Sequence, residues 1–214
     1  QRIVGTSQGG TLVVAVLRTA GSSRDLPDAG SDNSQITHGL RACGRDEARH
    51  RVNAMTDASN HLYVHVPFCD GKCGYCGFYS ERYTPEHAER FLKAIEEEIR
   101  RILPGTSEPE TIYFGGGTPS ILSDTELAEL CSVLLDRISI RHLREWTVEA
   151  NPGTLSPAKL RVLKEAGVNR ISLGAQSFDD ETLRRIGRRH DAGAIARTMS
   201  EVRSAGISNI GLDL

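Results

Sequence analysis

Short apolar runs alternate with helical segments along most of this 214-residue chain, and that alternation restricts its possible folds more than any other feature. Strands are expected at residues 62–66, 111–114, 146–150, 170–173 and 207–214. A repeated strand–helix order produces parallel strands joined by crossover helices, so the expected fold class is α/β. Two architectures satisfy this order, a doubly wound sheet and a TIM-like barrel.

Capping residues mark the expected helices. Thr84 precedes a proline at the start of the first helix, and apolar residues recur on one face of that helix. A capping box at residues 123–126 opens the second helix. The remaining helices are expected from Ser156 to Gly167, at 180–186 and at 192–205.

Polar or glycine-rich residues follow the carboxyl end of every expected strand, which is the active face in both architectures. A dinucleotide-binding sheet would carry a GxGxxG turn after a strand. The glycines at 115–117 lack that spacing. A TIM-like barrel, complete or partial, is therefore expected, and the chain would end before the last strand of that barrel.

The loop after the first expected strand contains a CxxxCxxC motif formed by Cys69, Cys73 and Cys76. Three thiolates on one loop can bind three irons of a cubane cluster and leave the fourth iron open to an exogenous ligand. A zinc site completed by His65 or a distant ligand is the alternative, but no second CxxC or HxxxH pair occurs. The odd total of five cysteines is typical of metal binding in a reducing compartment, and Cys43 and Cys131 are expected to be structural.

A second group of candidate site residues follows the later strands. The turn at residues 115–118 would let backbone approach a ligand closely, although a triple glycine is also common in plain strand-to-helix turns. Glu149 and Asp213 end expected strands, where a charge is costly unless it meets a ligand or partner. Gln176 and Arg188 follow the fourth strand, and solvation at the surface is the alternative for them.

Composition excludes several classes of function. A formal net charge of −2 gives no sign of binding to nucleic acid or an anionic membrane, and no apolar run approaches the length of a membrane-spanning helix. Residues 1–54 lack sustained periodicity and are expected to be a disordered extension or a gene-model artefact. Residues 55–214 would form one core domain, incomplete at its C-terminal end.

Several motifs occur in the order found in one protein family. Residues 63–69 read YVHVPFC, and after CxxxCxxC the later segments read FGGGTPS, EANPG, GVNRISLGAQSF and GRRH. With these motifs the chain resembles the radical S-adenosylmethionine (SAM) proteins related to oxygen-independent coproporphyrinogen III oxidase. The resemblance covers roughly residues 58–214, and several independent motifs carry it.

The resemblance implies a partial (β/α)6 barrel of radical SAM type with a [4Fe–4S] cluster at its mouth, held by the three cysteines of the motif. SAM would chelate the open iron, and an electron from the cluster could then cleave the sulfonium to give a 5′-deoxyadenosyl radical. Residues 116–118 would meet the methionyl amino end of SAM. The residues expected to flank or contact SAM are Tyr63, Tyr75, Gly116, Gly117, Thr118, Glu149, Gln176, Arg188 and Asp213.

The residue two positions after the third cysteine separates two branches of this group. The oxidases resemble CxxxCxxCxC, whereas this chain has Phe78 there, as in the heme-chaperone branch. The expected function is to bind heme and deliver it to an acceptor protein, with cluster and SAM as cofactors. The alternatives are oxidative decarboxylation of coproporphyrinogen III and, third, another radical SAM activity such as methyl transfer.

The resemblance also implies partners and a location. Heme is the expected cargo, and its acceptor is expected to be a protein, either soluble or membrane-associated. A flavodoxin or ferredoxin is the expected reductant. The expected location is the cytoplasm. His65, His142 and His190 are candidate heme ligands, and none of them is assigned.

Overall fold

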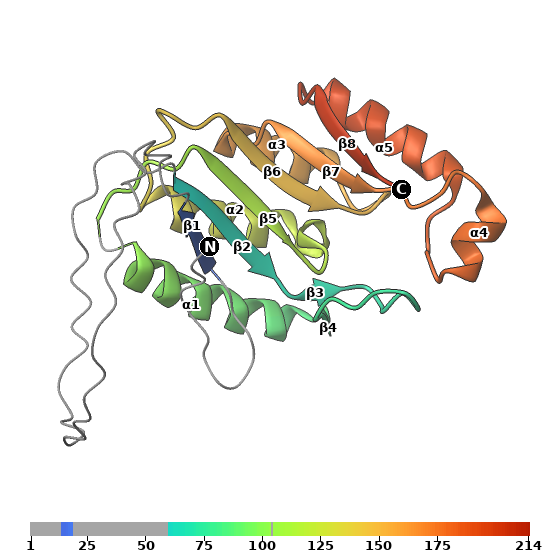
Figure 1. Cartoon of the computed structure of the whole chain (residues 1–214), viewed down its shortest axis with the longest axis horizontal. Coiled ribbons are helices and arrows are strands. Elements are labelled where there is room, and N and C mark those ends of the chain that lie inside the picture. The colour runs from blue at the N-terminus through green and yellow to red at the C-terminus, as the bar shows by residue number, and fades with distance from the viewer. Residues whose placement is uncertain (1–13, 19–59, 104) are drawn as a thin grey trace, which may run out of the picture.

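The structure, a computed structural model, describes residues 14–18, 60–103 and 105–214 (Figure 1). Six strands form one sheet in the order β1-β2-β5-β6-β7-β8, in which β1 is antiparallel to β2 and every other pair is parallel. The strands of this sheet are β1 (Val14–Arg18), β2 (Asn60–Val66), β5 (Thr111–Gly116), β6 (Glu145–Ala150), β7 (Arg170–Gly174) and β8 (Asn209–Asp213).

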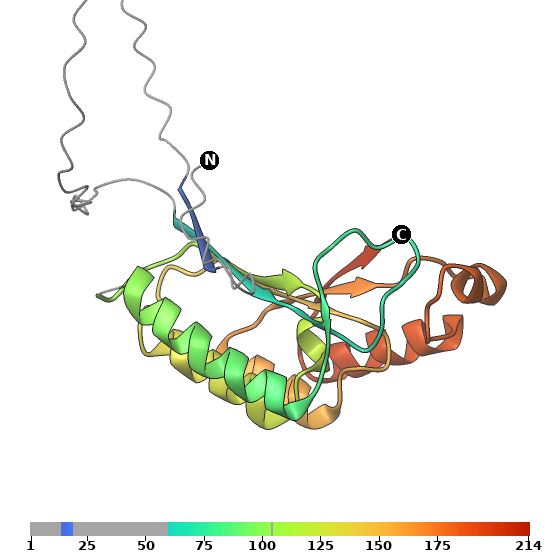
Figure 2. The ribbon, with the colours of Figure 1, turned by 90° about the horizontal axis from the view of Figure 1, so that it is seen from below.

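The five parallel strands lie in the sheet in the same order as in the sequence. A doubly wound sheet would instead reverse its strand order at one point and carry helices on both faces. Figure 2 shows the large helices together on one face of the sheet. The described strands therefore form an open arc of the barrel type, which confirms the expected fold class, with β1 and β8 at its two edges.

The helices begin at the capping residues that the sequence predicts. The Thr84 hydroxyl accepts a hydrogen bond from the His87 amide at the start of α1, and Ser123 and Glu126 form a reciprocal capping box at the start of α2. The helix α3 ends at Gly167, whose φ of 107° is the left-handed conformation that favours glycine. The helices are α1 (Pro85–Ile102), α2 (Asp124–Leu135), α3 (Pro157–Ala166), α4 (Asp180–Arg185) and α5 (Ala192–Ser204).

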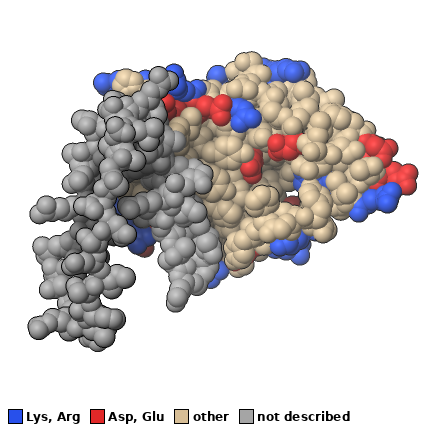
Figure 3. Space-filling view, in the orientation of Figure 1, with Lys and Arg blue, Asp and Glu red and all other residues tan. Residues whose placement is uncertain are grey.

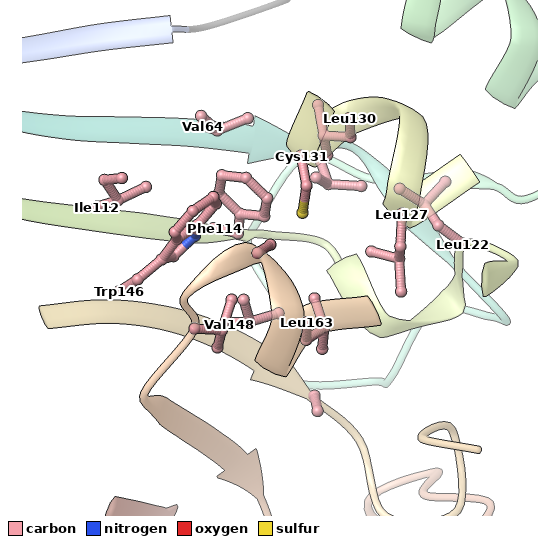
Figure 4. Close-up of a cluster of buried hydrophobic side chains, with 14 of the residues drawn as sticks. Val64, Ile112, Phe114, Leu122, Leu127, Leu130, Cys131, Trp146, Val148 and Leu163 are labelled. Atoms are coloured by element: carbon pink, nitrogen blue, oxygen red, sulfur yellow. The ribbon is translucent and has the colours of Figure 1, made fainter. Parts of the chain in front are cut away.

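The hydrophobic core lies between the sheet and the helices that cover it (Figure 4). At its centre the rings of Phe114 and Trp146 meet edge to face at a centroid distance of 5.4 Å, and both side chains are fully buried. Cys131 points into the same cluster from α2, and burial raises the pKa of its thiol to about 12. This position agrees with a structural role for Cys131, while Cys43 lies outside the described residues.

Three short strands were not expected from the sequence. Strand β1 lies within the segment 1–54 and pairs with β2, and the rest of that segment is outside the described residues. Two others, β3 (Phe68–Cys69) and β4 (Glu81–Arg82), pair with each other on either side of the cysteine loop. Among the described helices none is both long and apolar enough to cross a bilayer.

Replacing Leu130 with alanine should lower the free energy of unfolding by about 2–5 kcal/mol, because this fully buried side chain would leave a cavity between α2 and the sheet. The neighbouring exposed Glu129 is the matched control, and its replacement with alanine should change stability by less than about 0.5 kcal/mol. Urea denaturation would measure both values. Equal effects of the two substitutions would contradict the described packing of α2.

Candidate functional site

The carboxyl ends of the parallel strands surround a cavity of about 840 Å³. The cysteine loop covers one side of this cavity, and the segment that follows β7 covers another. Every residue that the sequence places in the site lines it: Tyr63, Cys69, Cys73, Tyr75, Cys76, Gly116, Gly117, Thr118, Glu149, Gln176, Arg188 and Asp213. The structure therefore brings together residues that span 150 positions of the sequence.

The cysteine loop presents three free, partly exposed thiols to the cavity. Its ends are closed by backbone hydrogen bonds, from the Glu81 amide to the Pro67 carbonyl (2.7 Å) and from the Tyr83 amide to the Cys69 carbonyl (3.1 Å). In the described ranges no three His, Cys, Asp or Glu side chains are arranged around a single metal ion. Three free thiols on one loop are the donor set that a cubane cluster uses, because such a cluster binds each thiolate through a different iron.

A glycine turn after β5 packs directly against the start of the cysteine loop. The amide of Gly117 donates to the Val66 carbonyl (2.9 Å), and the amide of Thr118 donates to the Phe68 carbonyl (2.7 Å). Gly116 has a φ of 110°, and a Cβ placed there would lie 2.5 Å from Cε1 of His65. Only glycine allows this close packing, and Gly116 and Gly117 also line the cavity.

Thr118 connects this turn to both a cysteine and the loop after β6. Its hydroxyl oxygen lies 3.4 Å from the sulfur of Cys69, and the side-chain amide of Asn151 donates to it at 3.0 Å. Thr118 is almost completely buried. These contacts join the candidate cluster loop to the ends of β5 and β6.

Glu149 is a half-buried carboxyl at the end of β6. The hydroxyl of Tyr113 donates to it at 2.7 Å, and the ring of Tyr113 stacks on that of Tyr63 at a centroid distance of 6.0 Å. Burial raises the pKa of Glu149, while the hydrogen bond from Tyr113 lowers it. Burial and the negative charge of Glu149 also raise the pKa of Tyr63 to about 12, so both tyrosines are neutral donors at physiological pH.

Arg188 reaches back over the end of β7. One terminal nitrogen donates to the Gly174 carbonyl (2.6 Å), the other lies 3.8 Å from the sulfur of Cys73, and its Nε is buried without a partner among the described residues. Gly174 makes room for the guanidinium, since a Cβ there would be 2.5 Å from it. The guanidinium therefore brings a positive charge to the cavity wall beside a candidate cluster ligand, which suits an anionic group of a bound molecule.

Gln176 and Asp213 meet at the same edge of the sheet. Gln176 is the one non-glycine residue with a positive φ (66°) in the described part of the chain, and its amide donates to the Asp213 carbonyl at 2.7 Å. Strained backbone of this kind is concentrated at ligand-binding sites. The hydroxyl of Ser172 donates to the Asp213 carboxylate at 3.3 Å, which orients that carboxylate at the rim.

Sequence reasoning missed four contributors to the site: Tyr113, Asn151, Ser172 and Gly174. Two of them follow from the strand register, which only the structure gives: Tyr113 pairs with Tyr63, and Ser172 pairs with Glu149. Of the three candidate heme ligands, only His190 lines the cavity, and its Nε2 already contacts the Ala175 carbonyl at 3.1 Å.

The raised pKa of Glu149 predicts how stability depends on pH. Since the folded state holds this proton more tightly than the unfolded state, the stabilisation is full below the usual pKa of 4.5 and is lost as pH rises through the folded-state pKa. Glu149→Gln should therefore gain stability relative to wild type between pH 4.5 and 7. Urea denaturation at both pH values measures this, and a constant difference would contradict the described burial. Tyr113→Phe should enlarge the pH-dependent loss.

Comparisons of the chain with protein families and with known proteins agree with one another. Residues 63–214 match the model of the Radical SAM superfamily. The heme chaperone HemW of Bacillus subtilis is 40% identical over 156 residues, which cover 71% of this chain and 41% of that protein. Radical S-adenosyl methionine domain-containing protein 1, mitochondrial, of Bos taurus is 37% identical over 155 residues, covering 72% and 35%.

A solved structure agrees with these relatives. Coproporphyrinogen III oxidase (HemN) from Escherichia coli, a radical SAM enzyme, superposes with a TM-score of 0.65 and 29% identity over 71% of this chain. This chain spans 36% of that enzyme and 41% of the Bacillus chaperone, so it corresponds to less than half of either protein. The matched region contains the parallel strands, the cysteine loop and the whole cavity lining, and the chain belongs to the radical SAM superfamily.

Proposed function

We propose that this protein is a heme chaperone that binds heme beside a SAM-ligated [4Fe–4S] cluster and delivers the heme to an acceptor protein. Membership in the radical SAM superfamily implies the cluster and SAM. The observation that carries the choice of a chaperone is Phe78, which lines the cavity with 69% of its surface exposed. A phenylalanine offers neither a thiolate nor a proton there, but its ring offers apolar contact to a flat porphyrin. The 40% identity to HemW supports the same choice.

In this proposal Cys69, Cys73 and Cys76 hold the cluster, and Gly116, Gly117 and Thr118 line the part of the cavity where the methionyl end of SAM would bind. The positive charge of Arg188 at the cavity wall suits an anionic group such as the carboxylate of SAM. Glu149 and Asp213 supply hydrogen-bond acceptors for hydroxyl groups, and Gln176 supplies an amide. Tyr63 and Tyr75 flank cluster and SAM, with Tyr75 half-exposed on the cysteine loop. A bound cluster supplies one electron and an open iron.

A second candidate function is oxidative decarboxylation of coproporphyrinogen III. The superposition on HemN, with a TM-score of 0.65, favours it as the alternative because both proteins share the sheet that surrounds the site. The two functions differ in what happens to the tetrapyrrole. A chaperone releases it unchanged, whereas the oxidase removes carboxyl groups from it.

The proposed function requires a cellular location, an electron donor and a heme acceptor. Free cysteines on an exposed loop suit the reducing cytoplasm, and a flavodoxin or ferredoxin would supply the electron. Lys, Arg, Asp and Glu side chains are interspersed on the described face of Figure 3, which suits protein partners better than nucleic acid. The heme acceptor would be a protein, either soluble or membrane-associated.

Turnover separates chaperone from oxidase. The intact protein, reconstituted anaerobically with iron and sulfide and given SAM, reductant and coproporphyrinogen III, should form no decarboxylated product. The same preparation should bind heme, detected by its Soret absorption, and pass it to an apo-hemoprotein. Product formation at a catalytic rate would reject the chaperone proposal in favour of the oxidase.

Phe78→Ala should weaken heme binding by up to about tenfold, because it removes the exposed ring beside the cavity. Ile140→Ala is the matched control, since Ile140 is also an exposed apolar residue but lies outside the cavity lining. Titration followed by absorption measures both affinities. Equal affinities of the two variants for heme would show that Phe78 is not part of the heme site.

Gly116→Ala should lower the affinity for SAM by about tenfold or more, because an alanine at a φ of 110° is strained and its Cβ meets the His65 ring. Gly105→Ala is the control, since a Cβ at that position has open space around it. Isothermal titration calorimetry of the reconstituted proteins measures the affinity. An unchanged affinity in Gly116→Ala would exclude the turn from the SAM site.

A further inference from the structure

We propose that Asn151 is a positioning residue that sets the reduction potential of the cluster through Thr118, by directing the Thr118 hydroxyl hydrogen onto the sulfur of Cys69. This inference rests on the proposed cluster site. Through its hydrogen bond to Thr118, Asn151 would act on the cluster without contacting iron or SAM. The chain of atoms is Asn151 Nδ2, Thr118 Oγ1 and Cys69 Sγ, with separations of 3.0 and 3.4 Å.

The direction of the hydrogen bonds follows from what each group can donate. A hydroxyl has one hydrogen and two lone pairs, and the Asn151 amide donates into one lone pair of Thr118. The hydroxyl hydrogen is then free for another acceptor. As a cluster ligand Cys69 is a thiolate without a proton, so in its contact with Thr118 the hydroxyl must be the donor.

The environment of Asn151 supports this orientation of its amide. Its side-chain oxygen and a terminal nitrogen of Arg188 both lie over Gly174, at 3.0 and 2.5 Å from the position of a Cβ there. The amide oxygen and the guanidinium therefore border the same space over Gly174, and the amide nitrogen donates to Thr118. Rotating the amide by 180° would turn its hydrogens toward a cation.

The position of Asn151 is held by its backbone. The backbone N–H of Asn151 donates to the Ser120 hydroxyl (3.4 Å), and the backbone carbonyl of Asn151 accepts from the Thr154 hydroxyl (2.7 Å). Thr118 is 4% exposed, so water does not compete freely for its hydroxyl. The hydrogen bond to Cys69 would therefore have a defined geometry.

A hydrogen bond to a cluster sulfur stabilises the more negative, reduced state of the cluster and so raises its reduction potential. Removing the amide of Asn151 would free the Thr118 hydroxyl from its fixed orientation. The reduced cluster would then lose part of its stabilisation. The expected result is a shift of the midpoint potential to a more negative value, with no loss of iron.

The test is a redox titration of the intact reconstituted protein without SAM, followed by the EPR signal of the reduced cluster. Asn151→Ala and Thr118→Val should each shift the midpoint to more negative values, and Thr118→Ser, which keeps the hydroxyl, should shift it less than Thr118→Val. In the Thr118→Val background, Asn151→Ala should cause no further shift. Additive shifts would show that Asn151 acts independently of Thr118 and would overturn the proposal.

Asn151→Asp separates hydrogen bonding from charge. An aspartate accepts the Thr118 hydrogen and withdraws it from Cys69, and it also adds a negative charge. The shift in midpoint potential caused by Asn151→Asp should be larger when residue 118 is threonine than in the Thr118→Val background, where only the added charge acts. Equal shifts in the two backgrounds would overturn the proposal, and this comparison also serves if Asn151→Ala does not fold.

Iron content distinguishes failure of this inference from failure of the proposed function. A wild-type protein that folds but assembles no four-iron cluster would reject the proposed cluster site together with this inference. A full cluster whose midpoint is the same in wild type, Asn151→Ala and Thr118→Val would reject only the role of Asn151.

Discussion

Two backbone hydrogen bonds, from Gly117 to Val66 and from Thr118 to Phe68, join the glycine turn to the start of the cysteine loop. The first bond belongs to the last parallel pair of β2 with β5, Val66 with Gly116, and the second lies just beyond the end of β2. Because these bonds attach the start of the cysteine loop to the end of β5, the core sheet fixes the position of the loop. The absence of a side chain at Gly116 and Gly117 is what allows the two segments to approach so closely.

The exceptions to ordinary folding rules gather at the same edge of the sheet. The core below it follows those rules, with apolar residues buried between sheet and helices and caps at the helix starts. At the edge, in contrast, the carboxyl of Glu149 is half-buried with a raised pKa, Gln176 has a positive φ and Arg188 has a buried donor without a described partner. Natural proteins tolerate such departures mainly at functional sites, where a ligand compensates for them.

The sequence predicted most of the fold and many of the residues that line the cavity, for different reasons. The five parallel strands and the helices were predictable because apolar periodicity and caps are local signals. Residues such as Glu149 and Asp213 were predictable because parallel strands bring their carboxyl ends to one edge. Strand β1 was not predicted, because an isolated apolar run carries no information about its pairing partner. Tyr113 and Asn151 were missed because their roles depend on neighbours 36 and 33 positions away in sequence.

The amino-acid sequence by itself determined the α/β class, the three-thiol loop and its place after the first parallel strand, since these depend on spacing along the chain. Only the tertiary structure decided how the loop is held, which tyrosine meets Glu149 and which amide meets Thr118. Those contacts depend on register and on the direction of side chains across neighbouring strands. Register is set by the packing of the whole sheet against its helices, and no local segment of the sequence encodes it.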